Sequence, residues 1–174
     1  MLSERPTNDL FGRLSGRGDG QRVGPPGQGP AGGAAEATPI RQTLPTGEVV
    51  LRSRSARDLM AHLRHALTAP DPDAEAELFL AYLLSERTQR EFLERGLEPR
   101  LAYDELRRRR EDCLRFFSRV GPLGERSPQV LLRMVGQNVM RLQLTGLAKE
   151  DLAWTYMDMV YEGGNWKLRW FGPS

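Results

Sequence analysis

Asp158 is the acidic residue embedded in the apolar hairpin that the C-terminal sequence predicts. A carboxylate surrounded by apolar side chains can act as a general base. Tyr156 or Tyr161, on the same strand, can donate a hydrogen bond to a developing oxyanion. The predicted strand register also places Asp158 opposite Arg169, and an ion pair across two strands requires no catalytic role. Asp158 and Tyr156 are therefore the catalytic candidates, and the ion pair is the alternative that we favour.

Two histidines and one cysteine complete the set of reactive side chains. His62 and His65 are three residues apart on a predicted helix, so two imidazoles can share a metal ion there. The sequence places no carboxylate or thiol to complete that site, and we expect exposed or half-buried histidines with no metal or other cofactor. Cys113 follows two arginines whose charges favour a reactive thiolate. Because no histidine is close to it in sequence, a buried and unreactive thiol is our prediction.

The charge balance excludes several classes of protein. Lys and Arg number 25 and Asp and Glu 23, so the net charge is +2, and binding to a polyanion is not indicated. The run Arg107–Arg110 winds around a predicted helix and lacks the interleaved aromatic residues of a nucleic-acid surface. A single cysteine excludes a disulfide framework. Because no apolar run approaches the roughly 18 residues of a membrane span, we expect a cytoplasmic protein that does not enter a membrane.

Glycine is concentrated near the N-terminus, where Gly12–Gly33 holds half of the 18 glycines and few apolar residues. Such a segment cannot bury enough apolar area to offset its ordering entropy. We therefore predict a disordered tail over residues 1–46 and a folded domain over 47–174. The tail begins with a small apolar group, Leu10, Phe11 and Leu14, which forms either a short docking motif for a protein partner or an unconstrained start.

Helical spacing dominates the first half of the predicted domain. A Ser55–Asp58 capping box starts one helix that Pro70 ends. Asp71 or Asp73 caps the next helix, and Ser85 or Thr88 starts a short third helix. A long helix follows from Pro99 to about Val120, with a break at Gly121–Gly124.

After Pro128 the apolar period changes from 3.6 to 2, which predicts four antiparallel strands. A three-residue turn at Gly136–Asn138 pairs Met134 with Met140 and places Arg133 beside Arg141. Because like charges face each other there, we expect an acidic group near them. The Gly163-Gly164 turn pairs Tyr161 with Trp166, and its register continues to Met159 with Leu168, Met157 with Trp170, Asp158 with Arg169 and Tyr156 with Phe171. Helices followed by an antiparallel meander make an α+β domain.

The last hairpin also carries a family pattern. Glu162-Gly163-Gly164-Asn165 is followed by Trp166-Lys167-Leu168. With the preceding helices, this pattern resembles the nuclear-transport-factor-two-like superfamily, which includes SnoaL-like and ketosteroid-isomerase-like folds, over residues 55–172. The resemblance implies a cone-shaped domain with a pocket between helices and a curved antiparallel sheet. Such folds usually place a further strand before the later sheet, and the segment between Glu94 and Tyr103 does not provide one.

One predicted sheet face would line the pocket of such a cone. Methionines and tryptophans gather on it, and a Met-rich surface adapts to an apolar ligand. Packing of this face against the helices as ordinary core is the alternative that we favour. The candidate pocket residues are Met134, Met140, Met157, Met159, Trp166 and Trp170.

We therefore expect a non-enzymatic binding or scaffold protein that holds an apolar ligand or a protein partner. An isomerase-, cyclase- or hydrolase-type enzyme that uses Asp158 without a cofactor is the alternative, and a nucleic-acid accessory protein is the second. The resemblance also implies a homodimer, because sheets of this fold often pair between subunits. Trp154, Tyr156 and Phe171, on the predicted outer face, are the candidate contacts.

Overall fold

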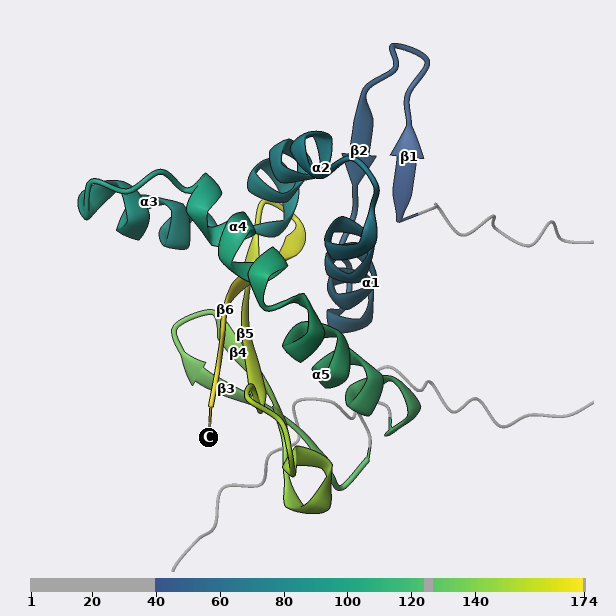
Figure 1. Cartoon of the computed structure of the whole chain (residues 1–174), viewed down its shortest axis with the longest axis vertical. Coiled ribbons are helices and arrows are strands. Elements are labelled where there is room, and N and C mark those ends of the chain that lie inside the picture. The colour runs from purple at the N-terminus through teal and green to yellow at the C-terminus, as the bar shows by residue number, and fades with distance from the viewer. Residues whose placement is uncertain (1–39, 124–126, 174) are drawn as a thin grey trace, which may run out of the picture. The chain divides into compact units, whose positions relative to one another are not determined.

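The computed structural model describes residues 40–123 and 127–173. Within these ranges, helices precede a four-stranded antiparallel sheet of order β3-β4-β5-β6, which confirms the α+β class (Figure 1). A two-stranded sheet, β1 (Arg41–Thr43) and β2 (Val49–Leu51), comes first. The helices are α1 (Ala56–Thr68), α2 (Pro72–Leu78), the π-helical η1 (Phe79–Leu83), α3 (Glu86–Glu94), α4 (Arg100–Arg108) and α5 (Arg110–Leu123). The later elements are β3 (Val130–Gly136), β4 (Val139–Leu144), the 3-10 turn η2 (Gly146–Lys149), β5 (Tyr156–Glu162) and β6 (Asn165–Gly172).

The start of the folded region differs from the predicted boundary at Gly47. Residues 1–39, with the predicted docking residues Leu10, Phe11 and Leu14, lie outside the described residues. Residues 41–43, which lie within the predicted tail, form β1 and pair with β2. Gly47 lies in the turn between these strands at a φ of 86°. The hairpin therefore belongs to the same unit as the helices and the large sheet.

Local side-chain caps start three of the helices, as the sequence predicts. The Ser55 hydroxyl accepts from the Asp58 N–H at 3.1 Å, and the Asp58 carboxylate accepts from the Ser55 N–H at 3.1 Å. Asp71 caps α2 through the N–H groups of residues 73 and 74, and Ser85 caps α3 through the Thr88 N–H at 3.1 Å. Each cap satisfies N–H groups that a helix leaves without an internal partner.

The prediction of one long helix is wrong, because this segment forms two helices that meet at Arg109. The backbone there has φ −101° and ψ 25°, outside helical geometry. Leu106 and Cys113 are buried on either side of the junction, and the residues between them are charged and not buried. No apolar contact therefore holds this turn in a straight helix. The second helix also continues past Gly121 to Leu123.

The first hairpin of the large sheet has the predicted register. Met134 lies opposite Met140, and Arg133 lies opposite Arg141. The turn itself differs, because it has two residues, with Asn138 at a φ of 58°. An irregularity between Met134 and Gly136 absorbs the difference in length.

The last hairpin follows the predicted register only as far as Met159 and Leu168. A β-bulge then leaves Arg169 without a partner on β5. Since side chains alternate across a strand, the extra residue reverses the faces of everything after it. The predicted pairs beyond the bulge are therefore wrong: Asp158 lies opposite Trp170, Met157 opposite Phe171 and Tyr156 opposite Gly172.

The inner face of the sheet packs against the helices in one hydrophobic cluster. Phe171 reaches this cluster because of the bulge and stacks on Trp154, with ring centroids 4.9 Å apart and planes 9° from parallel. It also meets Phe116 and Phe117 of α5 at 6.0 Å. Trp154 and Phe171 are buried, so the prediction that they form an outer contact face is wrong. Among the described residues, no helix is both long enough and apolar enough to cross a membrane.

Candidate functional site

Asp158 lies on the outer face of the sheet, held by its neighbour on β4. The Arg141 guanidinium donates from Nε and Nη2 to the two Asp158 oxygens, both at 2.7 Å. The same guanidinium lies 3.6 Å from the centre of the Tyr156 ring. Hydrogen bonding to Asp158 raises the pKa of Arg141, and its burial opposes this rise. The prediction that Asp158 forms a cross-strand ion pair is confirmed, but the predicted partner Arg169 is wrong, because the partner is Arg141. This pair also supplies the acidic group expected beside Arg133 and Arg141.

Arg169, at the bulge, turns to α3 instead. Its two Nη atoms donate to the Glu91 carboxylate, each at 3.0 Å, and Nη1 also donates to the Thr88 hydroxyl at 2.8 Å. The Thr88 hydroxyl donates to the Arg169 carbonyl at 3.0 Å. The hydrogen bond from Arg169 lowers the pKa of Glu91. These contacts fix α3 against the outer side of β6 and keep Glu91 ionised.

A groove of about 370 Å³ lies between α3 and the outer face of β5 and β6. Phe92 and Trp170 are half-buried in it and give it apolar surface. Each carboxylate of the groove already has an arginine partner, whereas the exposed Arg95 makes no ion pair with any residue of the described ranges. We call this site the α3–β6 groove, and its lining residues are Thr88, Glu91, Phe92, Arg95, Asp158, Arg169 and Trp170.

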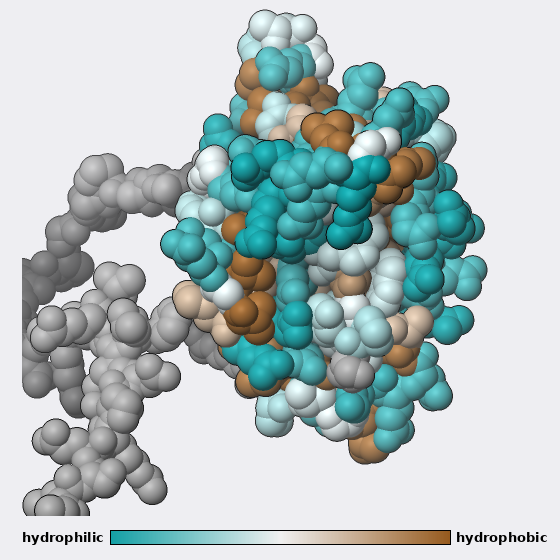
Figure 2. Space-filling model, turned by 90° about the vertical axis from the view of Figure 1, so that its left-hand side faces the viewer, coloured by the Kyte–Doolittle hydropathy of each residue, from teal (hydrophilic) through white to brown (hydrophobic). Residues whose placement is uncertain are grey.

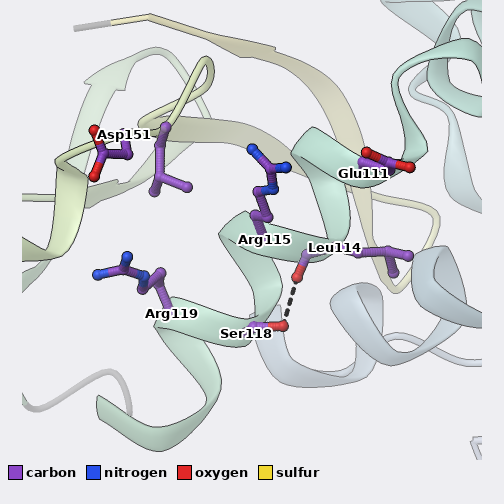
Figure 3. A pocket seen from close by; sticks show the side chains of 7 residues that line it. Glu111, Leu114, Arg115, Ser118, Arg119 and Asp151 are labelled. Carbon is purple, nitrogen blue, oxygen red and sulfur yellow. Dashed lines mark hydrogen bonds between the residues drawn. The ribbon is translucent and has the colours of Figure 1, made fainter.

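A second, larger depression of about 580 Å³ lies beside α5. Arg115 and Arg119 extend from one side of that helix toward the loop that carries Asp151 (Figure 3). The Ser118 hydroxyl is bound within the helix, since it donates to the Leu114 carbonyl at 2.7 Å. The charged side chains of this depression are all exposed, so it lacks an enclosed polar group that would select a ligand.

The structure separates the six predicted pocket residues. Met157 and Met159 are buried in the core, at most 1% exposed, and Met140 and Trp166 pack partly against it. The exposed Met134 stands on the outermost strand β3. Because of the bulge, Trp170 lines the α3–β6 groove on the other side of the sheet, and it also packs partly against the core. Core packing therefore accounts for most of the methionine and tryptophan pattern.

The remaining reactive side chains are those of His62, His65 and Cys113. His62 is buried, contrary to the expectation, and its Nε2 lies 3.1 Å from the Arg52 carbonyl oxygen. No cluster of three or more metal-ligating side chains occurs in the part of the chain that the structure describes. Cys113 is fully buried, and burial raises the pKa of its thiol to about 12. The prediction of a buried cysteine is thus confirmed.

Burial lowers the pKa of His62 below 6.5, its ordinary value. The unfolded chain therefore takes up a proton before the folded chain does, and stability is lost as the pH falls through 6.5. We expect the free energy of unfolding to decrease from pH 7 to pH 5.5, and to decrease less in His62→Gln, measured by urea denaturation. Equal slopes for wild type and His62→Gln would contradict this prediction.

Several groove residues were missed by the sequence reasoning. Thr88, Glu91, Phe92 and Arg95 are spaced three or four residues apart, which places them on one face of a helix. This spacing was a usable signal for a functional face of α3. The opposite wall comes from residues about 80 positions later, and no local pattern connects the two.

Comparison with known proteins gives no relative from which a function could be transferred. No family model, curated protein or solved structure matches this chain.

Proposed function

We propose that this protein is a non-catalytic binding protein whose α3–β6 groove takes a small aromatic ligand carrying a negative charge. The observation that carries the proposal is the composition of the groove: two half-buried aromatic side chains beside an arginine outside any ion pair. Phe92 and Trp170 offer apolar surface for a planar group. Arg95 offers a cation for an anionic substituent.

The charges of the groove favour an anion over a cation. Glu91 is neutralised by Arg169 and Asp158 by Arg141, with charge-assisted contacts of 2.7 to 3.0 Å. Because both carboxylates are paired, the positive charge of Arg95 makes the local electrostatic potential of the groove positive. A cationic ligand would have to compete with these arginines for each carboxylate, and an anionic ligand meets no such competition.

The same pairing argues against acid–base catalysis by Asp158. A general base must accept a proton from substrate, and both oxygens of Asp158 already accept hydrogen bonds from Arg141. Tyr156 lies beneath the Arg141 guanidinium. The ion pair and its aromatic support give these two residues a structural explanation, which favours binding over the enzymatic alternative.

The nucleic-acid alternative has less support. Within the run Arg107–Arg110, two arginines pair with Glu105 at 2.9 and 3.0 Å. Arg107 lies 3.5 Å from the Tyr103 hydroxyl, and Arg109 also covers the Trp154 ring at 5.4 Å. Arginines engaged within their own chain are poorly placed to neutralise phosphates.

The proposal keeps the nuclear-transport-factor-two-like resemblance and its cone shape. Helices that precede an antiparallel meander support it, as does the Gly163-Gly164 turn, with φ values of 57° and 81°. The segment between Glu94 and Tyr103 is the end of α3, a turn and the start of α4, so the absent strand remains a departure from the pattern. The homodimer, the docking role of Leu10, Phe11 and Leu14, and the cytoplasmic location belong to the same proposal.

Arg95→Glu should weaken binding of an aromatic anion. With 1-anilinonaphthalene-8-sulfonate as the probe, we expect its dissociation constant to rise about tenfold, since the substitution replaces attraction by repulsion near the sulfonate. Fluorescence titration at low salt measures the constant. Arg90→Glu, an equal charge change on α3 outside the groove, is the matched control and should change it less than twofold. Equal effects of both substitutions would refute the groove as the binding site.

A further inference from the structure

The outermost strand β3 is exposed on both faces. Its burial falls away after Val130, and every residue from Leu131 to Gly136 is exposed. Four of these residues are large and apolar: Leu131, Leu132, Met134 and Val135, which are 38 to 70% exposed. Natural sheets protect edge strands with charges, prolines or a covering segment. β3 contains one charged residue, Arg133, and no proline.

The β6 edge of the sheet forms backbone hydrogen bonds with other segments of the chain, whereas residues 131–136 of the β3 edge form none on their free side with the described residues. At the β6 edge, the Ser85 N–H donates to the Leu168 carbonyl at 2.9 Å, and the Trp166 N–H donates to the Ser53 carbonyl at 2.7 Å. No described residue makes a comparable backbone bond to the free side of Leu132 or Met134. In Figure 1, β3 lies on the side of the sheet away from α1 and α5. On the face shown in Figure 2, hydrophobic residues form separate patches among hydrophilic ones.

The direction of the β3 backbone groups follows from two hydrogen bonds of β4. The Leu144 N–H donates to Thr155 on the β5 side, at 2.8 Å, and the Thr145 N–H donates to Gln129 on the β3 side, at 2.9 Å. Antiparallel strands alternate these directions residue by residue. Leu131 and Arg133 therefore bond to β4, while the N–H and carbonyl groups of Leu132 and Met134 point to the free edge.

We propose that β3 pairs antiparallel with β3 of a second copy of this chain, with Leu132 on the two-fold axis. In this register Leu132 lies opposite the second copy's Leu132, and Met134 lies opposite the second copy's Val130. The Leu132 groups exchange two hydrogen bonds. The Met134 N–H of each copy donates to the other copy's Val130 carbonyl. The two sheets then form one eight-stranded sheet, in which Val130, Leu132 and Met134 extend the inner apolar face across the axis.

The charge of Arg133 and the irregularity near Gly136 favour this register over the registers centred on Arg133 or Met134. Centring the pair on Arg133 would place two guanidinium groups directly opposite each other, which is unfavourable in a sheet. Centring it on Met134 shortens the overlap and places the irregularity between Met134 and Gly136 inside the pairing. In the Leu132 register, Arg133 faces Leu131 of the second copy. Its Nη2 also donates to the Gln143 side chain at 3.1 Å, so it bends over β4 and leaves the edge clear.

The β3 pairing specifies the contact surface of the homodimer and therefore rests on the proposal that the protein is a homodimer. It does not depend on ligand binding in the α3–β6 groove. Sedimentation equilibrium of the full chain should show a dimer, and Met134→Lys should shift it to monomer by raising the dimer dissociation constant at least tenfold. Leu147→Lys, at an exposed leucine outside the sheet, is the matched control and should remain dimeric. A dimeric Met134→Lys overturns the β3 pairing and keeps the homodimer. A monomeric wild type overturns both, while binding of the anilinonaphthalene probe separately tests the groove.

Single cysteines placed along β3 test the register. Leu132→Cys should give a disulfide-linked dimer under mild oxidation, because paired residues at this position have Cα atoms about 5.5 Å apart, within disulfide range. Arg133→Cys and Met134→Cys should cross-link at least tenfold more slowly. The buried Cys113 leaves the background low. Fastest cross-linking of Arg133→Cys or Met134→Cys, measured on non-reducing gels, would overturn the Leu132 register.

Discussion

Phe171→Ala is expected to lower the free energy of unfolding by about 4 kcal/mol, the usual loss for a large aromatic side chain removed from a core. Phe171 is 4% exposed. It stacks on Trp154 and packs against Phe116 and Phe117 of α5, so its removal leaves a cavity between sheet and helix. Urea denaturation followed by far-UV circular dichroism measures the change.

The adjacent Trp170 is the matched control, since it is half-buried on the other face of the sheet. Trp170→Ala should lower the free energy of unfolding by about 1 kcal/mol, as is typical outside the core. A larger loss of stability for Phe171→Ala than for Trp170→Ala would show that the bulge at Arg169 is present. Without the bulge, Trp170 would face the helices and Phe171 the solvent, so a larger loss for Trp170→Ala would show that β6 has the simpler register.

Local signals in this sequence predicted local structure well. The capping box of Ser55 and Asp58 and the caps at Asp71 and Ser85 all occur as expected, because each is a contact between residues two or three positions apart. The register of the first hairpin was also predictable. Two apolar runs around a short turn have few ways to keep their apolar faces on one side.

Predictions failed where distant residues decide between two local solutions. Residues 168 to 171 offer two alternations, because Trp170 and Phe171 are both apolar and either can face the core. In the structure, Phe171 packs between Trp154 and the α5 residues Phe116 and Phe117, and the bulge in β6 places it there. The same reversal turns Arg169 toward Glu91, 78 residues away. The groove could not be read from the sequence, because its charge pairing depends on this one extra residue.

Arg141→Ala is expected to lower the free energy of unfolding by about 2 kcal/mol, because it leaves a largely buried carboxylate without its partner. Asp158 is 19% and Arg141 23% exposed at the side chain, so solvent screens the pair only in part. Loss of the guanidinium also uncovers the Tyr156 ring, which lies 3.6 Å from it. Arg133→Ala, which removes an exposed arginine opposite Arg141, is the control and should change stability by less than about 0.5 kcal/mol.

A double-mutant cycle assigns the partner of Asp158. We expect a coupling energy of about 1 to 2 kcal/mol between Arg141→Ala and Asp158→Asn. Either substitution alone removes the bidentate ion pair, so the second substitution costs less when the first is already present. The cycle of Arg169→Ala with Asp158→Asn should give a coupling energy near zero, because Arg169 bonds to Glu91 and Thr88. A substantial coupling of Asp158 to Arg169 would restore the unbulged register. Asp158 would then not be bound by Arg141. The pairing that argues against a catalytic role of Asp158 would be absent.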